Sequence, residues 1–252
     1  MIIRSEEDKF ICIEQHHHAQ LSRQMIEHWK PHVLNGDPFA FDVLYAIEQH
    51  DVGWDRFDRQ PLWNDKTNEP YTFIDLPLLI KTVLYTYGIN LVEERNPYAA
   101  ALCSAHYAHF LKKYEMKEVQ QFVKKEALRR KRILNSFPEI DELTFRKHLS
   151  LLQFADNLSL FICLHEPGNN EKRHRYFEKG IPLGKPLENP ESDYIDAHWV
   201  DGQTLTLKKL PKVKPFSVLV KEKHIDKTTI AEKGWLKSYE ETPYEERKIY
   251  VS

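Results

Sequence analysis

Apolar residues in the first two thirds of the chain recur at intervals of three and four positions, which is the spacing of an amphipathic helix. His18 shares one such face with Leu21 and Met25, and Asp156 shares another with Leu152. The segment 53–77 is rich in Asp, Pro and Asn and is typical of a loop. The pattern predicts helices over residues 16–29, 38–51, 77–92, 97–114, 116–136 and 141–164.

Alternating and β-branched segments mark the two ends of the chain. Residues 1–15 predict a short β element, and further strands are expected over 194–200, 204–208, 216–220 and 248–251. Asp201-Gly202 between two alternating runs is typical of a hairpin turn. We therefore expect a mainly α fold, in which a helical core over residues 1–167 includes the short β element. A small antiparallel β extension at the C-terminus, residues 168–252, would pack on that core.

Composition narrows the function classes. The chain has 252 residues and a formal net charge of −2, so no general positive field attracts nucleic acid or an anionic membrane. The basic residues within 124–132 lie on a predicted helix that also carries an apolar stripe, and they are expected to form its solvated face. No apolar stretch is long enough for a membrane span, and three widely spaced cysteines favour a reducing compartment. We expect a cytoplasmic protein that binds neither nucleic acid nor membrane.

Four polar residues fall on segments with apolar periodicity: His18, the adjacent pair His50 and Asp51, and Asp156. A buried carboxylate needs a partner, and imidazoles and carboxylates that converge from different helices form a mixed site for a divalent metal. Taken alone, His18 is more typical of a hydrogen-bonded histidine of the core than of a metal ligand. His106 and His109, three positions apart on one predicted helix, are candidate ligands of a second metal or of an anionic substrate.

Four short motifs, in this order, resemble a bacterial family of unknown function, DUF3891. They are Gln15-x-x-His18-Ala19, His50-Asp51-x-Gly53-Trp54, Ser104-x-His106-Tyr107 and Asp156-x-Leu158-Ser159-Leu160. The resemblance covers most of the chain. The order of His18, His50-Asp51 and Asp156 is also similar to the HD-domain superfamily of metal-dependent phosphohydrolases, and this similarity implies an HD-domain-like helical bundle.

The superfamily resemblance implies a role for each ligand. The residues that correspond to His18, His50, Asp51 and Asp156 would hold a divalent ion, which can be Mn, Fe, Ni, Co or Mg. Members with two metals have additional histidines between the His-Asp pair and the last Asp, and His106 and His109 lie in that interval. One or two ions per chain are therefore expected.

The residues after the His-Asp pair are the candidates for catalysis and for substrate binding. Asp51 would position the nucleophile, and Asp55 would handle a proton if the helix continues past Gly53. Arg56 and Arg59 would hold a phosphate, because a guanidinium matches its oxygens in a bidentate manner, or they are surface arginines. Trp54 would stack on a base or fill the core.

These expectations lead to a metal-dependent phosphohydrolase that acts on a small phosphate ester, with nucleotides among the candidates. One alternative is a di-iron oxygenase, because imidazole and carboxylate ligands alone do not separate manganese from iron. Another is a non-catalytic regulatory protein that binds a metal or ligand and uses the β extension to dock a partner or to form a homodimer. A purely structural role is disfavoured, because two buried carboxylates beside two histidines are costly without an ion.

Overall fold

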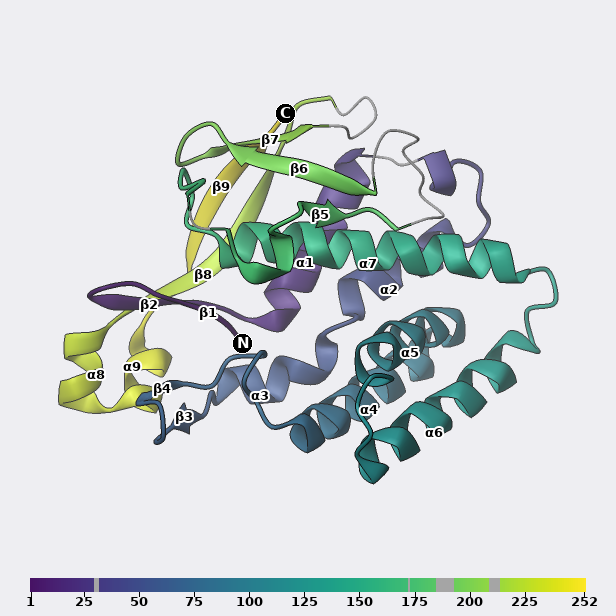
Figure 1. Cartoon of the computed structure of the whole chain (residues 1–252), viewed down its shortest axis with the longest axis horizontal. Coiled ribbons are helices and arrows are strands. Elements are labelled where there is room, and N and C mark those ends of the chain that lie inside the picture. The colour runs from purple at the N-terminus through teal and green to yellow at the C-terminus, as the bar shows by residue number, and fades with distance from the viewer. Residues whose placement is uncertain (30–31, 172, 185–192, 209–213) are drawn as a thin grey trace.

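A seven-stranded sheet forms one side of the molecule, and the long helices form the other (Figure 1). The computed structural model describes residues 1–29, 32–171, 173–184, 193–208 and 214–252. The sheet order is β1-β2-β8-β9-β7-β6-β5; β7 and β9 are parallel, and all other neighbours are antiparallel. The strands are β1 (Ile2–Ser5), β2 (Lys9–Ile13), β5 (Ile181–Pro182), β6 (Tyr194–Trp199), β7 (Thr204–Lys208), β8 (Phe216–Asp226) and β9 (Glu245–Val251).

The expected fold class, a mainly α HD-domain-like bundle with a small antiparallel C-terminal extension, is therefore wrong. The sheet is mixed and large, and it takes strands from both ends of the chain. β2 pairs with β8 in the register Phe10↔Ile225, so strands on either side of the expected boundary at residue 167 belong to one sheet. Each strand has its own local pattern, but a pairing over such a sequence separation leaves no periodic signal along the chain.

The six predicted helices are present, with ends that differ by a few residues from the expected ones. Asn96 caps α5 by accepting a hydrogen bond from the backbone of Ala99 at 2.9 Å, and Asp141 caps α7 through Thr144 at 2.7 Å. The helices are α1 (Gln15–Trp29), α2 (Ala40–Gln49), α4 (Leu78–Arg95), α5 (Pro97–Leu111), α6 (Lys117–Leu134) and α7 (Glu142–Leu164).

Two regions that lack a helical pattern contain short elements. The predicted loop over 53–77 includes the 3₁₀ turn η2 (Val52–Trp54), α3 (Asp55–Arg59) and the small hairpin of β3 (Trp63–Asn64) and β4 (Glu69–Pro70). Between β8 and β9 the chain forms α8 (Lys227–Lys233) and α9 (Trp235–Glu241). Two further 3₁₀ turns are η1 (His32–Leu34) and η3 (Arg175–Phe177).

Helix α1 lies between the sheet and the other helices, and it connects the two sides of the molecule. It packs against α2, α7 and β8, and the Gln24 side chain accepts a hydrogen bond from the backbone of Leu219 at 3.1 Å. The main apolar core is continuous across this contact and includes Leu21, Ile47, Leu152 and Val220. Sheet and helices are therefore stabilised by the same buried surface.

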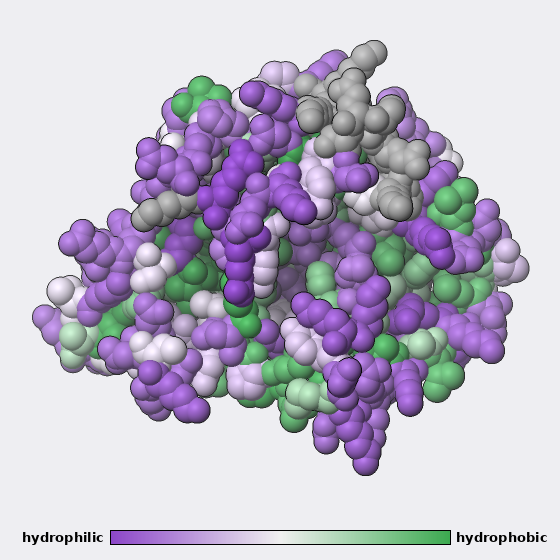
Figure 2. Space-filling model, viewed as in Figure 1, coloured by the Kyte–Doolittle hydropathy of each residue, from purple (hydrophilic) through white to green (hydrophobic). Residues whose placement is uncertain are grey.

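The surface is mostly hydrophilic on the face shown in Figure 2, with apolar residues in small groups. Among the helices in the described parts of the chain, none combines the length and the apolarity that a membrane crossing requires. Cys12, Cys103 and Cys163 are buried free thiols.

Candidate metal centre

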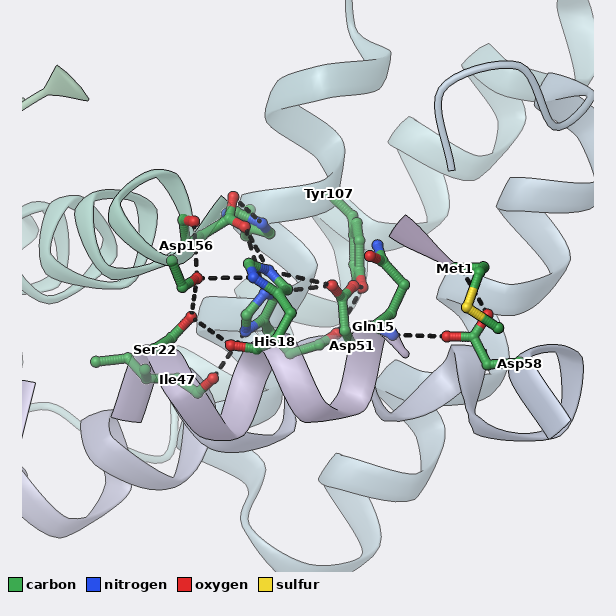
Figure 3. A network of polar contacts seen from close by, with 12 residues as sticks. Met1, Gln15, His18, Ser22, Ile47, Asp51, Asp58, Tyr107 and Asp156 are labelled. Carbon is green, nitrogen blue, oxygen red and sulfur yellow. Dashed lines mark hydrogen bonds and ion pairs between the residues drawn. The ribbon is translucent and has the colours of Figure 1, made fainter. Parts of the chain in front are cut away.

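Five polar side chains from four helical segments converge in the interior of the helical side. His18 comes from α1, His50 and Asp51 directly follow α2, His106 comes from α5, and Asp156 comes from α7. Each is at most 5% exposed. Figure 3 shows His18 between Asp51 on one side and Asp156 on the other.

The facing atoms of this cluster are the Nε2 nitrogens of the histidines and the oxygens of the two carboxylates. His18 Nε2 lies 3.0 Å from Asp156 Oδ1 and 3.7 Å from Asp51 Oδ2. His50 Nε2 lies 3.4 Å from Asp51 Oδ2 and 3.6 Å from Asp156 Oδ1. His106 Nε2 lies 3.5 Å from Asp156 Oδ2. Two groups of three, His18/His50/Asp51 and His50/His106/Asp156, have ligand atoms within 4.8 Å of one another, and they share His50.

The hydrogen bond of His50 fixes which of its nitrogens faces the carboxylates. Its Nδ1 lies 2.7 Å from the carbonyl oxygen of Ile47, which can only accept, so Nδ1 carries the proton. In the neutral ring Nε2 is then a bare lone pair, and it has no hydrogen-bond partner among the described residues. A buried lone pair that faces two carboxylates requires a cation or a proton between them.

The His18 ring is oriented by two serines. Its Nδ1 lies 2.7 Å from Ser159 Oγ, which in turn lies 3.0 Å from the carbonyl oxygen of Asp156 and 2.6 Å from Ser22 Oγ. On the other side of the ring, Nε2 lies 3.0 Å from Asp156 Oδ1, so without a metal ion this contact needs a proton on one of the two groups. Outer hydrogen bonds such as the one at Nδ1 orient a metal-binding histidine.

Asp51 is oriented by Tyr107, which directly follows His106 on α5. The Tyr107 hydroxyl makes a short hydrogen bond to Asp51 Oδ1 and lies 2.6 Å from the carbonyl oxygen of His50. The ring of Tyr85 on α4 stacks on Tyr107 with centroids 3.8 Å apart. As a result, Oδ2 of Asp51 faces the histidines.

Charge in this cluster is balanced by the histidines. Burial alone would raise the pKa of Asp156, but the hydrogen bond with His18 and the nearby imidazoles of His50 and His106 hold it well below its usual range. Burial would lower the pKa of His50, but the carboxylates of Asp51 and Asp156 outweigh it and raise the pKa to about 9. Burial lowers the pKa of His106 to about 4. Without a metal ion, a proton on His50 would therefore supply the positive charge that faces the two carboxylates.

The donor set fits a divalent ion of the borderline class. Three neutral imidazoles and two carboxylates are the ligands that Mn, Fe, Co, Ni and Zn accept in proteins. The sequence suggested four ligands, His18, His50, Asp51 and Asp156. Of the two further candidates, His106 and His109, the structure brings only His106 to these four.

Two other residues that the sequence suggested lie away from the cluster. His109 is exposed on α5 and its ring contacts Phe110, so it is outside both ligand groups. Three positions on a helix turn a side chain by about 300°, and here only His106 faces inward. Trp54 is 1% exposed and packs against Phe57 and Tyr85, so it fills the core and offers no free face to a base.

The charged residues of α3 also lie outside the cluster. Asp55 forms an ion pair with Arg59 at 3.0 Å, and the Arg59 side chain is 71% exposed. Arg56 lies over the ring of Tyr87, 5.1 Å from its centre. The reason is local, because α2 ends at Gln49, the turn η2 follows, and α3 is a separate short helix.

Sequence reasoning missed the residues that hold the ligands in place. Ser22 lies four positions after His18, on the same helix face, and this spacing was the available signal. Tyr107 and Ser159 appear in the motifs quoted above but had no assigned role. Tyr85 comes from a helix with no other residue at the centre, so no local pattern points to it.

Comparison with known proteins adds one finding. Residues 1–227 match a family described as "Protein of unknown function (DUF3891)". No curated protein and no solved structure shows significant similarity to the chain. The matched segment contains all five converging side chains and the residues that orient them. The chain belongs to the DUF3891 family.

Proposed function

We propose that this protein is a metal-dependent phosphohydrolase that acts on a small phosphate ester. Its ligands for one or two divalent ions would be His18, His50, Asp51, His106 and Asp156. The main support is the buried Nε2 of His50, which faces two carboxylates and has no hydrogen-bond partner among the described residues. A metal ion satisfies all three groups at once.

The reaction class is supported by the order of the ligands. A His, an adjacent His-Asp pair and a distant Asp on separate helices resemble the HD-domain superfamily, whose members hydrolyse phosphate esters. A buried mixed site of this kind also suits a hard phosphoryl substrate better than a thiolate site would.

When bound, a divalent ion supplies a lowered pKa for a coordinated water and polarises a phosphoryl oxygen. The chain itself contributes orientation. The Tyr107 hydroxyl holds Oδ1 of Asp51, which leaves Oδ2 to face the metal and to position the attacking water. Ser159 fixes the orientation of the His18 ring through its contact with Nδ1. Near-complete burial of the cluster limits competing water and strengthens these interactions.

Elemental analysis of protein without a polyhistidine tag, combined with phosphatase assays, tests the proposal. We expect stoichiometric Mn, Fe, Co, Ni or Mg, and release of phosphate or of p-nitrophenol from p-nitrophenyl phosphate, its diester or a nucleotide. His50→Ala and Asp51→Asn should lose both metal and activity. Asp55→Asn is the matched control, since Asp55 lies outside the cluster, is partly exposed and is paired with Arg59, and it should retain both. Absence of metal in the unaltered protein would overturn the proposal.

An iron oxygenase is the second candidate, favoured by the two carboxylates, Asp51 and Asp156, that both face His50. A carboxylate has two oxygens and can bridge two neighbouring ions. Bound iron with visible absorption and oxygen consumption, but without phosphate release, would replace the hydrolase assignment. Bound metal with neither activity would indicate a regulatory role.

A further inference from the structure

A pocket lies apart from the metal centre, at the end of the molecule where α8, α9 and the β3–β4 hairpin meet (Figure 1). Its volume is about 760 Å³, which is within the range of small-molecule sites. None of its lining residues belongs to α1, α2, α5 or α7, so the pocket shares no residue with the proposed active site.

Three aromatic rings from distant parts of the chain form one wall of this pocket. Phe10 of β2 meets Trp63 of β3 and Trp235 of α9 nearly edge to face, with centroids 6.4 and 6.2 Å apart. Trp63 and Trp235 are 5.8 Å apart and inclined by 43°. Ile230 of α8 adds an aliphatic side.

The indole N–H of Trp235 is already hydrogen-bonded. Its Nε1 donates to the carbonyl oxygen of Pro61 at 2.7 Å, so Trp235 offers the pocket only apolar ring atoms. The face of an indole carries negative electrostatic potential and attracts cations, more strongly than the face of any other side chain.

Glu69 supplies a carboxylate at the same pocket. It is exposed, and its one hydrogen bond within the described parts of the chain comes from Ser5 Oγ at a long 3.4 Å. No described lysine or arginine forms an ion pair with it. Its charge is therefore available to a ligand.

Lys227 also lines the pocket, but its ammonium is engaged. It donates to the carbonyl oxygen of Glu6 and to Ser5 Oγ at 3.3 Å, and it lies 4.8 Å from the centre of the Phe10 ring. Phe10 thus already has a cation beside its ring, whereas no described lysine or arginine lies over the indole of Trp63 or Trp235. Lys227 should weaken the binding of a second cation, and Glu69 should offset that effect.

We propose that this pocket binds an organic cation, an alkyl- or arylammonium group with an apolar body. The cation would lie against Trp63 and Trp235 and face Glu69, and the apolar body would cover Ile230. Both indoles would contribute cation–π attraction, and the exposed Glu69 would add an ion pair.

Calorimetric titration of the full-length protein with three probes tests this assignment. The probes are benzyltrimethylammonium, choline, and the neutral analogue of choline in which carbon replaces the quaternary nitrogen. We expect benzyltrimethylammonium to bind most tightly, because its ring adds apolar contact, and the neutral analogue to bind least. Quenching of tryptophan fluorescence should accompany binding, and loss of that quenching in Trp63→Leu would locate it.

Charge-changing variants separate a cation site from a general apolar pocket. Glu69→Gln should weaken binding of benzyltrimethylammonium by about fivefold, and Lys227→Gln should strengthen it. Glu94→Gln, an exposed glutamate of α4 outside the pocket, should leave it unchanged. Equal affinity for choline and its neutral analogue, weaker binding in Lys227→Gln, or no binding of any probe would each overturn the proposal. The metal content of the candidate metal centre does not depend on these outcomes, so the two proposals can fail separately.

Discussion

His106 and His109 provide a direct comparison between an inward and an outward histidine of one helix. The Nε2 of His106 lies 3.5 Å from Asp156, and His109 is exposed one turn later. His106→Ala should weaken metal binding by at least about tenfold, because a ligand is lost without replacement. His109→Ala should have no effect. Competition with a fluorescent metal chelator measures both, and equal affinities would remove His106 from the centre.

Tyr107 offers a test of the groups that orient the ligands. Tyr107→Phe removes the hydrogen bond to Asp51 and keeps the ring stacked on Tyr85. We expect metal affinity to fall by about 10- to 100-fold while the fold remains. Tyr98→Phe is the control, since Tyr98 lies on the same helix but bonds to His148 at 2.7 Å. It should cost about 1 kcal/mol of unfolding free energy and leave metal affinity unchanged. Similar metal affinities in the two variants would contradict the role of Tyr107.

The convergence of the five polar side chains was suggested by the sequence, because His18 and Asp156 interrupt otherwise hydrophobic stripes, and such interruptions have a short list of explanations. The contact of Tyr85 was not predictable, because it depends on which helices meet. Asp55, Arg56 and Arg59 lie outside the cluster, because the helix that carries the His-Asp pair does not continue past Gly53.

Two glycines, Gly53 and Gly88, meet where η2 contacts α4. A Cβ on Gly88 would lie 2.8 Å from the backbone nitrogen of Gly53, and one on Gly53 would overlap the carbonyl oxygen of Leu84. The backbones can approach this closely only without side chains. The contact sets the position of the segment that directly follows His50 and Asp51.

Gly88→Ala should therefore destabilise the protein by about 1–3 kcal/mol, as overpacking does in a well-packed core. It should also weaken metal binding, because η2 and the preceding Asp51 must shift. Gly202→Ala is the control, since no atom lies within 4 Å of the position of its Cβ. Thermal unfolding with and without added metal measures both effects. An unchanged Tm in Gly88→Ala would show that the contact tolerates a methyl group.

Long helices were predicted well, whereas short elements were not. Each of the six segments with sustained periodicity forms a helix, because many turns repeat the same signal. α3, α8 and α9 span five to seven residues, and their formation depends on neighbours in the fold more than on their own composition. Trp235 illustrates this dependence, because its helix is held by contacts with Phe10 and Trp63.

The chain as a whole is organised by a sheet whose strands come from both ends. β2 has β1 on one side and β8 on the other, and α1 packs on β8. We expect a fragment of residues 1–167 to lack a cooperative unfolding transition, because β2 would expose an unpaired edge and α1 would lose its contact with the sheet. Circular dichroism during heating measures this. A cooperative transition with metal bound would show that the helical part folds alone.

Long-range pairing explains why the fold class was wrong although most elements were correct. The hairpin of β6 and β7 was predictable, because its turn is local and Asp201 binds the backbone of Gln203 and Thr204 at 2.7 Å. The pairing of β7 with β9 and of β2 with β8 had no such local marker.

His18 and Asp156 are 138 positions apart in sequence and touch at the centre. An ion held by both would close a very long loop, and in this respect it would act as a reversible cross-link between α1 and α7. Such a cross-link would exist only while metal is bound, so a fall in the concentration of available metal would expose the chain to proteases. The lifetime of the protein in a cell would then report metal status, independently of any reaction at the centre.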